Sequence, residues 1–234
     1  MTTLISFLGK GQDGRGYRPA SYRFEDGFIS EGQKYLGLTL TQKIKPTRVI
    51  LLGTSGSMWD VFLESGAGSL ESEWLELADS VKQQTVDMLQ LRPFEKYLQQ
   101  SMGMPVHCEL IPYARNTTEQ LDILSRLAEL LAEGEDVVID VTHGFRHLPM
   151  LALVAARFLQ KTSKINVKQI YYGAFEMSQD SLTPVLELRG LLELLDWVDA
   201  LTTFDKDGDY SVFASLLESQ NFSGANAGLL RKAA

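Results

Sequence analysis

The hydrophobic positions of this 234-residue chain fall in short apolar runs that alternate with longer segments of helical period. Short runs bounded by glycine and polar residues are typical of buried parallel strands, and the longer segments are typical of helices that cover such a sheet. Six segments fit strands, namely residues 4–8, 48–53, 106–112, 136–141, 166–174 and, more weakly, 184–188. Four segments fit helices, namely residues 31–42, 71–90, 118–132 and 148–161. The pattern therefore predicts an α/β fold with a mostly parallel sheet flanked by helices.

The pattern changes near residue 191, where apolar residues recur at helical spacing without another strand. A second short helix is expected to run through residue 217. We therefore expect a small C-terminal helical appendage rather than a further strand–helix unit. Residues 223–228 are rich in glycine and alanine and are expected to be flexible, while residues 229–234 could begin another helix.

Composition limits the classes of partner. The net charge of −8 and the isoelectric point near 5.0 argue against binding duplex nucleic acid, because such proteins usually carry a basic face. A small anion remains possible, since a few backbone amides and two or three cations can bind phosphate locally. The single cysteine, Cys108, excludes an internal disulfide, and the first residues are too short an apolar run for a membrane span or signal peptide. A cytoplasmic location is the default expectation.

The first candidate loop follows the predicted strand at residues 4–8 and contains Leu8, Gly9, Lys10 and Gly11. Its small residues, cation and amides can cradle a phosphate. It lacks the P-loop spacing and the Gly-x-Gly-x-x-Gly fingerprint, so a surface loop without a ligand is an equal alternative.

The second candidate loop follows the strand at residues 48–53 and contains Thr54, Ser55, Gly56 and Ser57. Its hydroxyl groups and amides could hold a phosphate or a ribose, although they could equally form a plain helix cap. Trp59 comes directly afterwards and is expected to lie in the core.

The third candidate is the dense polar turn after the strand at residues 136–141. The hydroxyl of Thr142 and the amides of His143 and Gly144 can donate to phosphates or base edges, and Arg146 can bind a phosphate with two parallel hydrogen bonds. His143 is also a possible general base.

The neighbours of this turn have plainer explanations. Asp140 and Phe145 are expected to hold the turn in shape, and a structural hydrogen bond or a surface position is expected for His147. His143 and His147 stand four residues apart but lack the glutamate of the His-Glu-x-x-His pattern, so no metal site is expected.

Three blocks together resemble a known family, the CRISPR-associated Rossmann-fold (CARF) proteins of type III systems. They are residues 5–9, residues 52–60 and the Asp140-Val141-Thr142-His143-Gly144-Phe145-Arg146 motif, which is characteristic of one subgroup. The resemblance implies a Rossmann-like sensing domain over residues 1–188. It also implies that residues 189–234 are a helical connector or the remnant of an effector domain.

The same resemblance implies a homodimer that senses one cyclic oligoadenylate, a ring of four or six nucleotides made during antiviral defence. The binding loops then correspond to Leu8–Gly11, Thr54–Ser57 and Thr142–Arg146. No cofactor is implied. Many relatives continue into a HEPN ribonuclease domain, whose motif needs a histidine. The last histidine here is His147, so this chain is not expected to be that ribonuclease as it stands, and an effector could be missing.

Two enzymatic alternatives stay open. Some relatives are ring nucleases, which cut the cyclic messenger without metal by aligning a ribose 2′-hydroxyl with the neighbouring phosphorus. Lys10, Ser57, His143 and Arg146 would be the catalytic candidates. An unrelated nucleotide-cofactor enzyme is the weaker alternative, because the glycine fingerprint of such enzymes is missing.

Overall fold

The computed structural model describes residues 1–11, 16–62 and 70–219. The chain divides into two compact units, Met1–Glu187 and Leu188–Ala234, which are described separately below.

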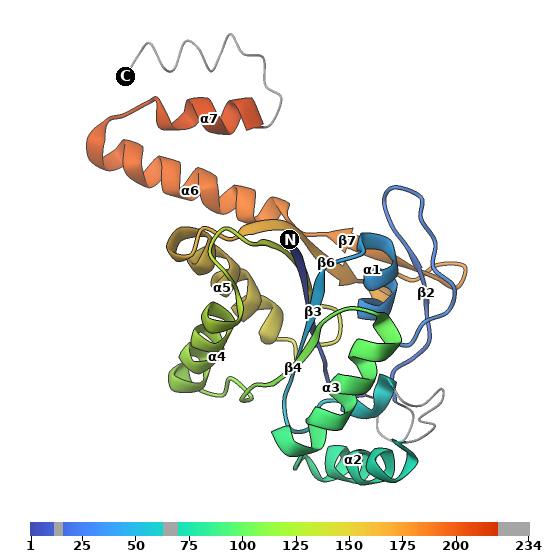
Figure 1. Ribbon diagram of the computed structural model, residues 1–234. Coiled ribbons are helices and arrows are strands. Elements are labelled where there is room, and N and C mark those ends of the chain that lie inside the picture. The colour runs from blue at the N-terminus through green and yellow to red at the C-terminus, as the bar shows by residue number, and fades with distance from the viewer. Residues whose placement is uncertain (12–15, 63–69, 220–234) are drawn as a thin grey trace. The chain divides into compact units, whose positions relative to one another are not determined.

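The described part of the first unit is built around a seven-stranded sheet with the order β2-β7-β6-β5-β1-β3-β4 (Figure 1). The strands are β1 (Thr2–Phe7), β2 (Ser21–Arg23), β3 (Arg48–Gly53), β4 (Val106–Leu110), β5 (Asp136–Asp140), β6 (Asn166–Gly173) and β7 (Leu182–Glu187).

Five neighbouring strands, from β4 to β6, run parallel to one another. At the centre, Ile5 of β1 pairs with Ile50 of β3 on one side and with Ile139 of β5 on the other. The predicted α/β fold with a mostly parallel sheet is confirmed. The weakly expected last strand is β7, and it pairs antiparallel to β6. The short edge strand β2 was not predicted, because three residues are too few to show an alternating pattern.

The helices of this unit are α1 (Leu36–Ile44), α2 (Glu71–Gln83), α3 (Met88–Met102), α4 (Thr117–Leu130) and α5 (Leu148–Thr162), with 3-10 turns at η1 (Trp59–Phe62) and η3 (Phe175–Met177). Alternate residues of β1 show how the two layers of helices are held. Ile5 and Phe7 face apolar residues of α4 and α5, whereas Leu4 and Leu8 belong to the cluster that includes residues of α1 and α3. The sheet is therefore buried on both faces, as its apolar strands require.

The predicted helix at residues 71–90 is wrong, since two helices occupy this region. The first ends at Gln83, and the next residue, Gln84, takes the left-handed conformation with φ of 58°. The second begins after Asp87, whose side chain accepts from the N–H of Gln90 in a reciprocal capping box. Pro93 lies within α3, and a proline inside a helix removes a backbone donor and usually marks its end, which is why the sequence did not reveal that helix. The helix predicted at 31–42 begins later, at Leu36.

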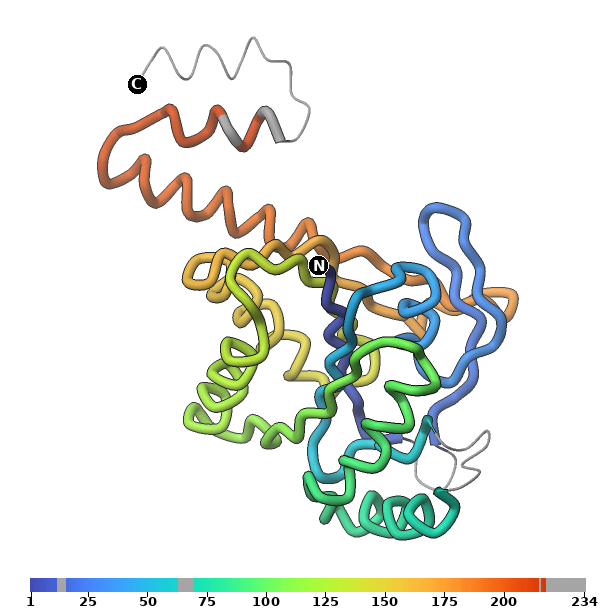
Figure 2. Tube along the Cα trace, viewed as in Figure 1, coloured from blue at the N-terminus to red at the C-terminus, as the bar shows by residue number. Residues whose placement is uncertain are grey.

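The second unit contains α6 (Gly190–Asp207) and α7 (Val212–Ser219), traced at the red end of the tube in Figure 2. Aromatic contacts join the two helices, since the ring centroids of Trp197 and Phe213 lie 6.0 Å apart. Gly208 allows the turn between them with φ of 70°. The predicted helical appendage is confirmed. The tail predictions for residues 223–228 and 229–234 lie outside the described residues.

Candidate functional site

The carboxyl ends of β1 and β5 meet at the point where the strand order reverses. From β1 the chain moves toward β3, and from β5 it moves the other way, toward β6. Such a switch point leaves a crevice outside the carboxyl ends of the two strands, where open α/β sheets bind ligands. The three predicted loops follow β1, β3 and β5, which are neighbours in the sheet, so the fold brings all three to one edge.

The loop after β1 is fixed through the backbone of Gly9. The N–H of Gly9 donates to the Tyr17 hydroxyl at 2.8 Å, and that hydroxyl donates to the Gly9 carbonyl at 2.7 Å. The Met58 N–H donates to the same carbonyl at 3.0 Å. A β-carbon at residue 9 would lie 1.4 Å from the carbonyl oxygen of His143, so only glycine permits this close approach.

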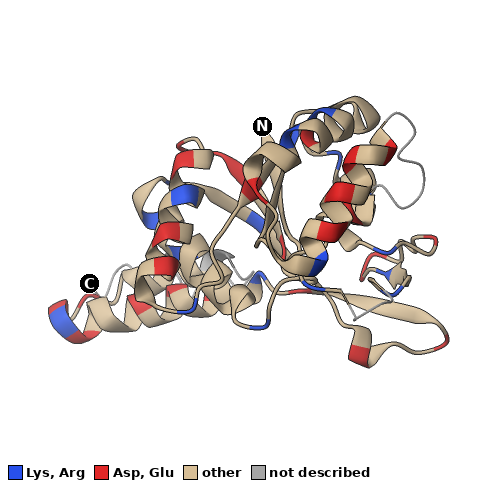
Figure 3. Cartoon of the chain, turned by 90° about the horizontal axis from the view of Figure 1, so that it is seen from below, with Lys and Arg blue, Asp and Glu red and all other residues tan. Residues whose placement is uncertain are grey.

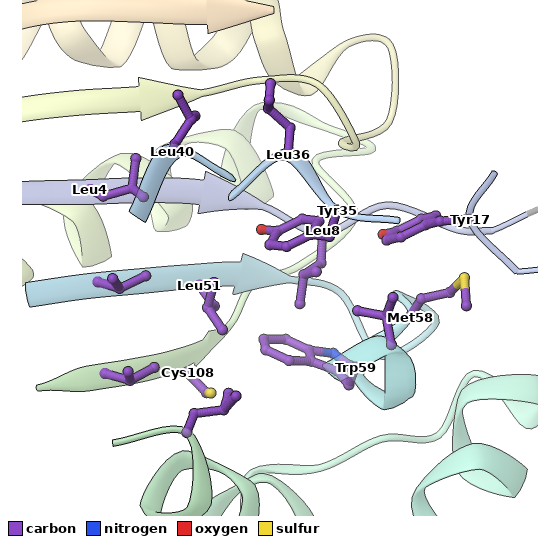
Figure 4. Packing of buried hydrophobic residues seen from close by; sticks show 14 of the residues in the cluster. Leu4, Leu8, Tyr17, Tyr35, Leu36, Leu40, Leu51, Met58, Trp59 and Cys108 are labelled. Atoms are coloured by element: carbon purple, nitrogen blue, oxygen red, sulfur yellow. The ribbon is translucent and has the colours of Figure 1, made fainter. Parts of the chain in front are cut away.

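The loop after β3 turns most of its hydroxyl groups inward. Ser57 is fully buried; its Oγ donates to the Leu8 carbonyl at 2.8 Å and accepts from the Thr54 N–H at 2.9 Å. Thr54 is also fully buried. Trp59 lies in the core as expected and is 3% exposed (Figure 4). Its Nε1–H donates to the Thr54 carbonyl. Of the two serine side chains predicted here, only Ser55 reaches the surface in part.

Asp140 lies beneath the third loop at the end of β5 and is fully buried. The Ser6 hydroxyl and the Thr142 N–H both donate to its carboxylate, and the Tyr35 hydroxyl donates in turn to Ser6 at 2.7 Å. Burial raises the pKa of Asp140 above its ordinary value, although these donors oppose the shift. The network fixes the start of the turn, in line with the structural role expected for Asp140.

The imidazole of His143 is packed inside the turn. Its Nε2 accepts from the Leu36 N–H at 3.2 Å, and the ring stacks on Tyr17 with centroids 4.4 Å apart. Tyr35 and Phe175 contact the same ring. Burial lowers the pKa of His143 to about 3, so the ring is neutral at physiological pH. These contacts support a positioning role for the side chain, whereas its backbone faces the loop after β1.

The backbone of the same turn keeps donors for a ligand. Within the described residues, the N–H groups of His143 and Gly144 have no acceptor. The Arg146 side chain is exposed and makes no hydrogen bond or ion pair with any described residue. The Thr142 hydroxyl accepts from the Gly173 N–H at 2.9 Å and holds the turn to β6. Lys10 is exposed on the neighbouring loop, and Gly11 and Gly144 are partly exposed. This edge thus combines two cations with unpaired amides, which suits an anion.

The aromatic residues of the turn lie nearer the surface than the core. Phe145 is half-buried and contacts the Tyr113 ring with centroids 5.7 Å apart, so it joins the turn to the loop after β4. His147 is exposed, and its Nε2 lies 2.8 Å from the Tyr113 carbonyl oxygen, in agreement with the expected structural hydrogen bond.

Two residues of this edge were missed by the sequence reasoning. Tyr113 and Arg115 follow β4, and the Tyr113 hydroxyl lies 3.2 Å from the Ser55 Oγ. The Arg115 guanidinium lies over the Tyr113 ring at 4.8 Å from its centroid. An aromatic residue and a cation just after a predicted parallel strand are a usable signal, because ligands bind at that end of the strand.

Other kinds of site find little support in the described part of the chain. No group of three or more His, Cys, Asp or Glu residues there could hold a metal ion. No described helix is long and apolar enough to cross a membrane. Acidic and basic residues are interspersed in the view of Figure 3, where no continuous basic face is seen.

The comparison with protein families decides the identity of the first unit. The family described as "CRISPR system endoribonuclease Csx1, CARF domain" matches residues 3–176, which include all three loops. The chain belongs to this CARF family. A CARF domain is a sensor domain associated with type III CRISPR systems, so the resemblance seen in the sequence is confirmed at the level of the family.

A curated relative supports the same assignment. The CARF chain is 26% identical over 246 residues to the CRISPR-associated protein MJ1674 of Methanocaldococcus jannaschii. The alignment covers 94% of this chain and 39% of the relative. The chain therefore spans about two fifths of the length of that protein.

Proposed function

We propose that this CARF domain binds a cyclic oligoadenylate at the carboxyl edge of β1 and β5. The observation that carries the proposal is the interlocking of two loops, in which the Gly9 backbone packs directly on the carbonyl of His143. That contact brings Lys10 and Arg146, both exposed, to the same edge.

The chemistry of the edge suits a nucleotide phosphate. The unpaired N–H groups of His143 and Gly144 donate to phosphate oxygens, and the Arg146 guanidinium adds a charged pair of hydrogen bonds. The domain as a whole is acidic, with a net charge of −8, so its field does not favour long nucleic acids. A small anion bound by a few local donors is compatible both with the donors of this edge and with the net negative charge of the chain.

We propose that the functional unit is a homodimer formed through α5. Met150, Val154 and Phe158 stand four residues apart on this helix and are 66%, 62% and 47% exposed. Leu121 of the neighbouring helix α4 adds a fourth exposed apolar side chain. Apolar side chains gathered at helical spacing on a surface are typical of an interface between proteins.

A second copy of the chain is the occupant that best fits this surface. Met150 lies in the first turn of α5, which begins two residues after Arg146, so a two-fold axis beside α5 and parallel to it sets the two Thr142–Arg146 turns close together. A ring with an even number of identical nucleotides can share that axis, and each contact is then made twice. In a longer protein, the ligand would act on an effector through the helical unit.

Binding is better supported than cleavage. Of the four catalytic candidates, Ser57 is buried and doubly hydrogen-bonded, and His143 is a neutral ring that already accepts from a backbone N–H. Lys10 and Arg146 are exposed and can bind an anion without cutting it. We therefore propose a sensor and not a ring nuclease.

The experiment is a titration of the purified chain with cyclic tetra-adenylate and cyclic hexa-adenylate, followed by chromatography of the ligand. The proposal predicts binding of one of the two rings with the ligand recovered intact. Linear products would contradict a pure sensor. Absence of binding to both rings would contradict the proposed function as a whole.

A further inference from the structure

A cleft of about 370 Å³ opens beside the proposed site, at the carboxyl end of β4. It is lined by Ser55, Tyr113, Arg115, Glu119, Asp122 and Arg126, together with residues 110–112. We call it the Tyr113 cleft. Its volume falls within the range of roughly 300–1,000 Å³ that is typical of small-molecule sites in proteins.

The Tyr113 cleft is continuous with the loops of the proposed site. The Ile111 N–H donates to the Gly53 carbonyl at 2.8 Å, so the cleft lies directly beside the end of β3. The Tyr113 hydroxyl lies 3.2 Å from the Ser55 Oγ, and the Tyr113 ring contacts Phe145 of the turn after β5. A ligand held by that turn can therefore extend a further group into the cleft.

The backbone between the two main residues of the cleft is strained. Ala114 has φ of 57°, a left-handed conformation that is unfavourable for a residue with a side chain, and it is only 5% exposed. Strained, buried positions of this kind persist where the surrounding structure fixes them, and they are frequent at ligand sites. Here the Arg115 guanidinium stands over the Tyr113 ring in a cation–π pair. Among the described residues, Arg115 has no carboxylate partner for its side chain.

The charges of the cleft favour a neutral group over a phosphate. Its lining holds two guanidinium groups and two carboxylates, which balance each other. The Glu119 carboxylate accepts from the backbone N–H of Arg115 at 2.9 Å, and the Asp122 carboxylate accepts from the Nε–H of Arg126 at 3.0 Å. A flat aromatic ring that carries an amine fits this set, because guanidinium and tyrosine planes stack on it and a carboxylate oxygen accepts from the amine.

We propose that the Tyr113 cleft receives an adenine base of the ligand, stacked on Arg115 and Tyr113, with its exocyclic amine toward Asp122 and Glu119. This inference rests on the proposed function, because the base belongs to the ring held by the Thr142–Arg146 turn. The cleft then supplies recognition of the base, and the turn supplies recognition of the phosphate.

The test measures the affinity of the cyclic adenylate that the wild-type chain binds. Arg115→Ala and Tyr113→Leu are expected to weaken binding roughly 5- to 150-fold, as for loss of a stacking partner of a base. Arg92→Ala, which removes an exposed arginine on α3, is the matched control and should bind like the wild type. Thermal unfolding of each variant verifies that it is folded. Tyr113→Phe keeps the ring and should bind nearly as well as the wild type, so a weak-binding Tyr113→Phe would overturn the stacking role of Tyr113 even if Tyr113→Leu does not fold.

The variant Arg115→Lys distinguishes stacking of Arg115 on a base from an ion pair of Arg115 with a phosphate. Lysine keeps the charge but not the planar guanidinium, so stacking predicts that Arg115→Lys binds nearly as weakly as Arg115→Ala. Wild-type affinity in Arg115→Lys together with weak binding in Arg115→Ala would overturn the base assignment. A ring of inosinate, in which a carbonyl oxygen replaces the amine, should bind the wild-type chain at least about tenfold more weakly than the adenylate ring.

The possible failures are distinguishable. Wild-type affinity in Arg115→Ala and in Tyr113→Leu would overturn this inference and leave the proposed function in place. Failure of the wild-type chain to bind either cyclic adenylate would overturn both.

Discussion

Gly9 lies against the backbone carbonyl of His143, and a β-carbon on Gly9 would stand only 1.4 Å from that oxygen. The two residues are 134 positions apart, yet this contact joins the loop after β1 to the turn after β5. Since both loops belong to the proposed site, the geometry of that site depends on a residue without a side chain.

Gly9→Ala should therefore disturb the site strongly. The added methyl group meets backbone atoms, which cannot rotate away, so the loops must separate. We expect a loss of about 1–3 kcal/mol or more in unfolding free energy, as for overpacked cores, and loss of ligand binding. Denaturant unfolding and ligand titration measure the two effects.

Gly32→Ala is the matched control for this prediction. A β-carbon at residue 32 meets no atom within 4 Å, so the same chemical change should leave stability and binding near wild type. Equal behaviour of the two variants would show that the Gly9–His143 contact does not hold the site together.

His143 should make the stability of the domain depend on pH. Its pKa is about 3 in the fold and 6.5 in the reference state, so between these values the unfolded chain binds more protons than the folded chain. Stability from the neutral ring is complete above pH 6.5 and falls as the pH drops toward 3, by up to about 1.4 kcal/mol per pH unit.

Denaturant unfolding from pH 7.5 to pH 5 should show this loss of stability in the wild-type chain. His143→Gln is the comparison, because it has no titrating ring at this position and should lack that part of the pH dependence. The variant should be less stable at pH 7.5, because it loses the stacking on Tyr17, and the difference should narrow as the pH falls. Parallel curves for the two proteins would exclude a buried neutral imidazole.

Ser57→Ala should lower stability because the Ser57 hydroxyl is buried and makes two hydrogen bonds. Its removal leaves the Leu8 carbonyl and the Thr54 N–H without this partner, which should cost about 1–3 kcal/mol. Calorimetric unfolding checks the value. A stable variant that had lost a ligand-cleaving activity would instead support Ser57 as a catalytic residue.

Val154→Glu should convert a dimer into a monomer, because it sets a charge in the middle of the exposed apolar stripe of α5. Light scattering or analytical ultracentrifugation of the wild-type and variant chains measures the mass. Leu89→Glu is the matched control, since Leu89 is 71% exposed on α3, away from that stripe. A monomeric wild type, or a dimer that survives Val154→Glu, would contradict the proposed interface.

The central sheet was predictable because its strands are buried on both faces and therefore appear as continuous apolar runs, such as residues 48–53 and 136–141. β2 and α3 were not predictable in the same way. β2 forms because it pairs with β7, and its own three residues do not predict a strand. α3 contains Pro93, and a proline argues against a helix when the sequence is read alone. A partner distant in sequence therefore decides β2, whereas a proline inside the helix conceals α3.

The candidate site was predictable as a set of loops but not as a set of contacts. Parallel strands deliver their carboxyl ends to one edge, so the loops at Leu8, Thr54 and Thr142 follow from the strand assignments alone. The sequence cannot tell whether a hydroxyl faces inward. Ser57 and His143 are the kind of residue that binds ligands, yet here their side chains bond to backbone groups from other loops.

Binding of a cyclic oligoadenylate by the Thr142–Arg146 turn is tested most directly by calorimetric titration of cyclic tetra-adenylate or hexa-adenylate into the wild-type chain, Arg146→Ala and Arg92→Ala. We predict one ring bound per two wild-type chains and an affinity about 10- to 150-fold weaker in Arg146→Ala, the loss expected for a charged hydrogen-bonded pair. Arg92→Ala should match the wild type. Wild-type affinity in Arg146→Ala would exclude Arg146 from the binding site, and no binding by the wild-type chain would exclude a cyclic oligoadenylate as its ligand.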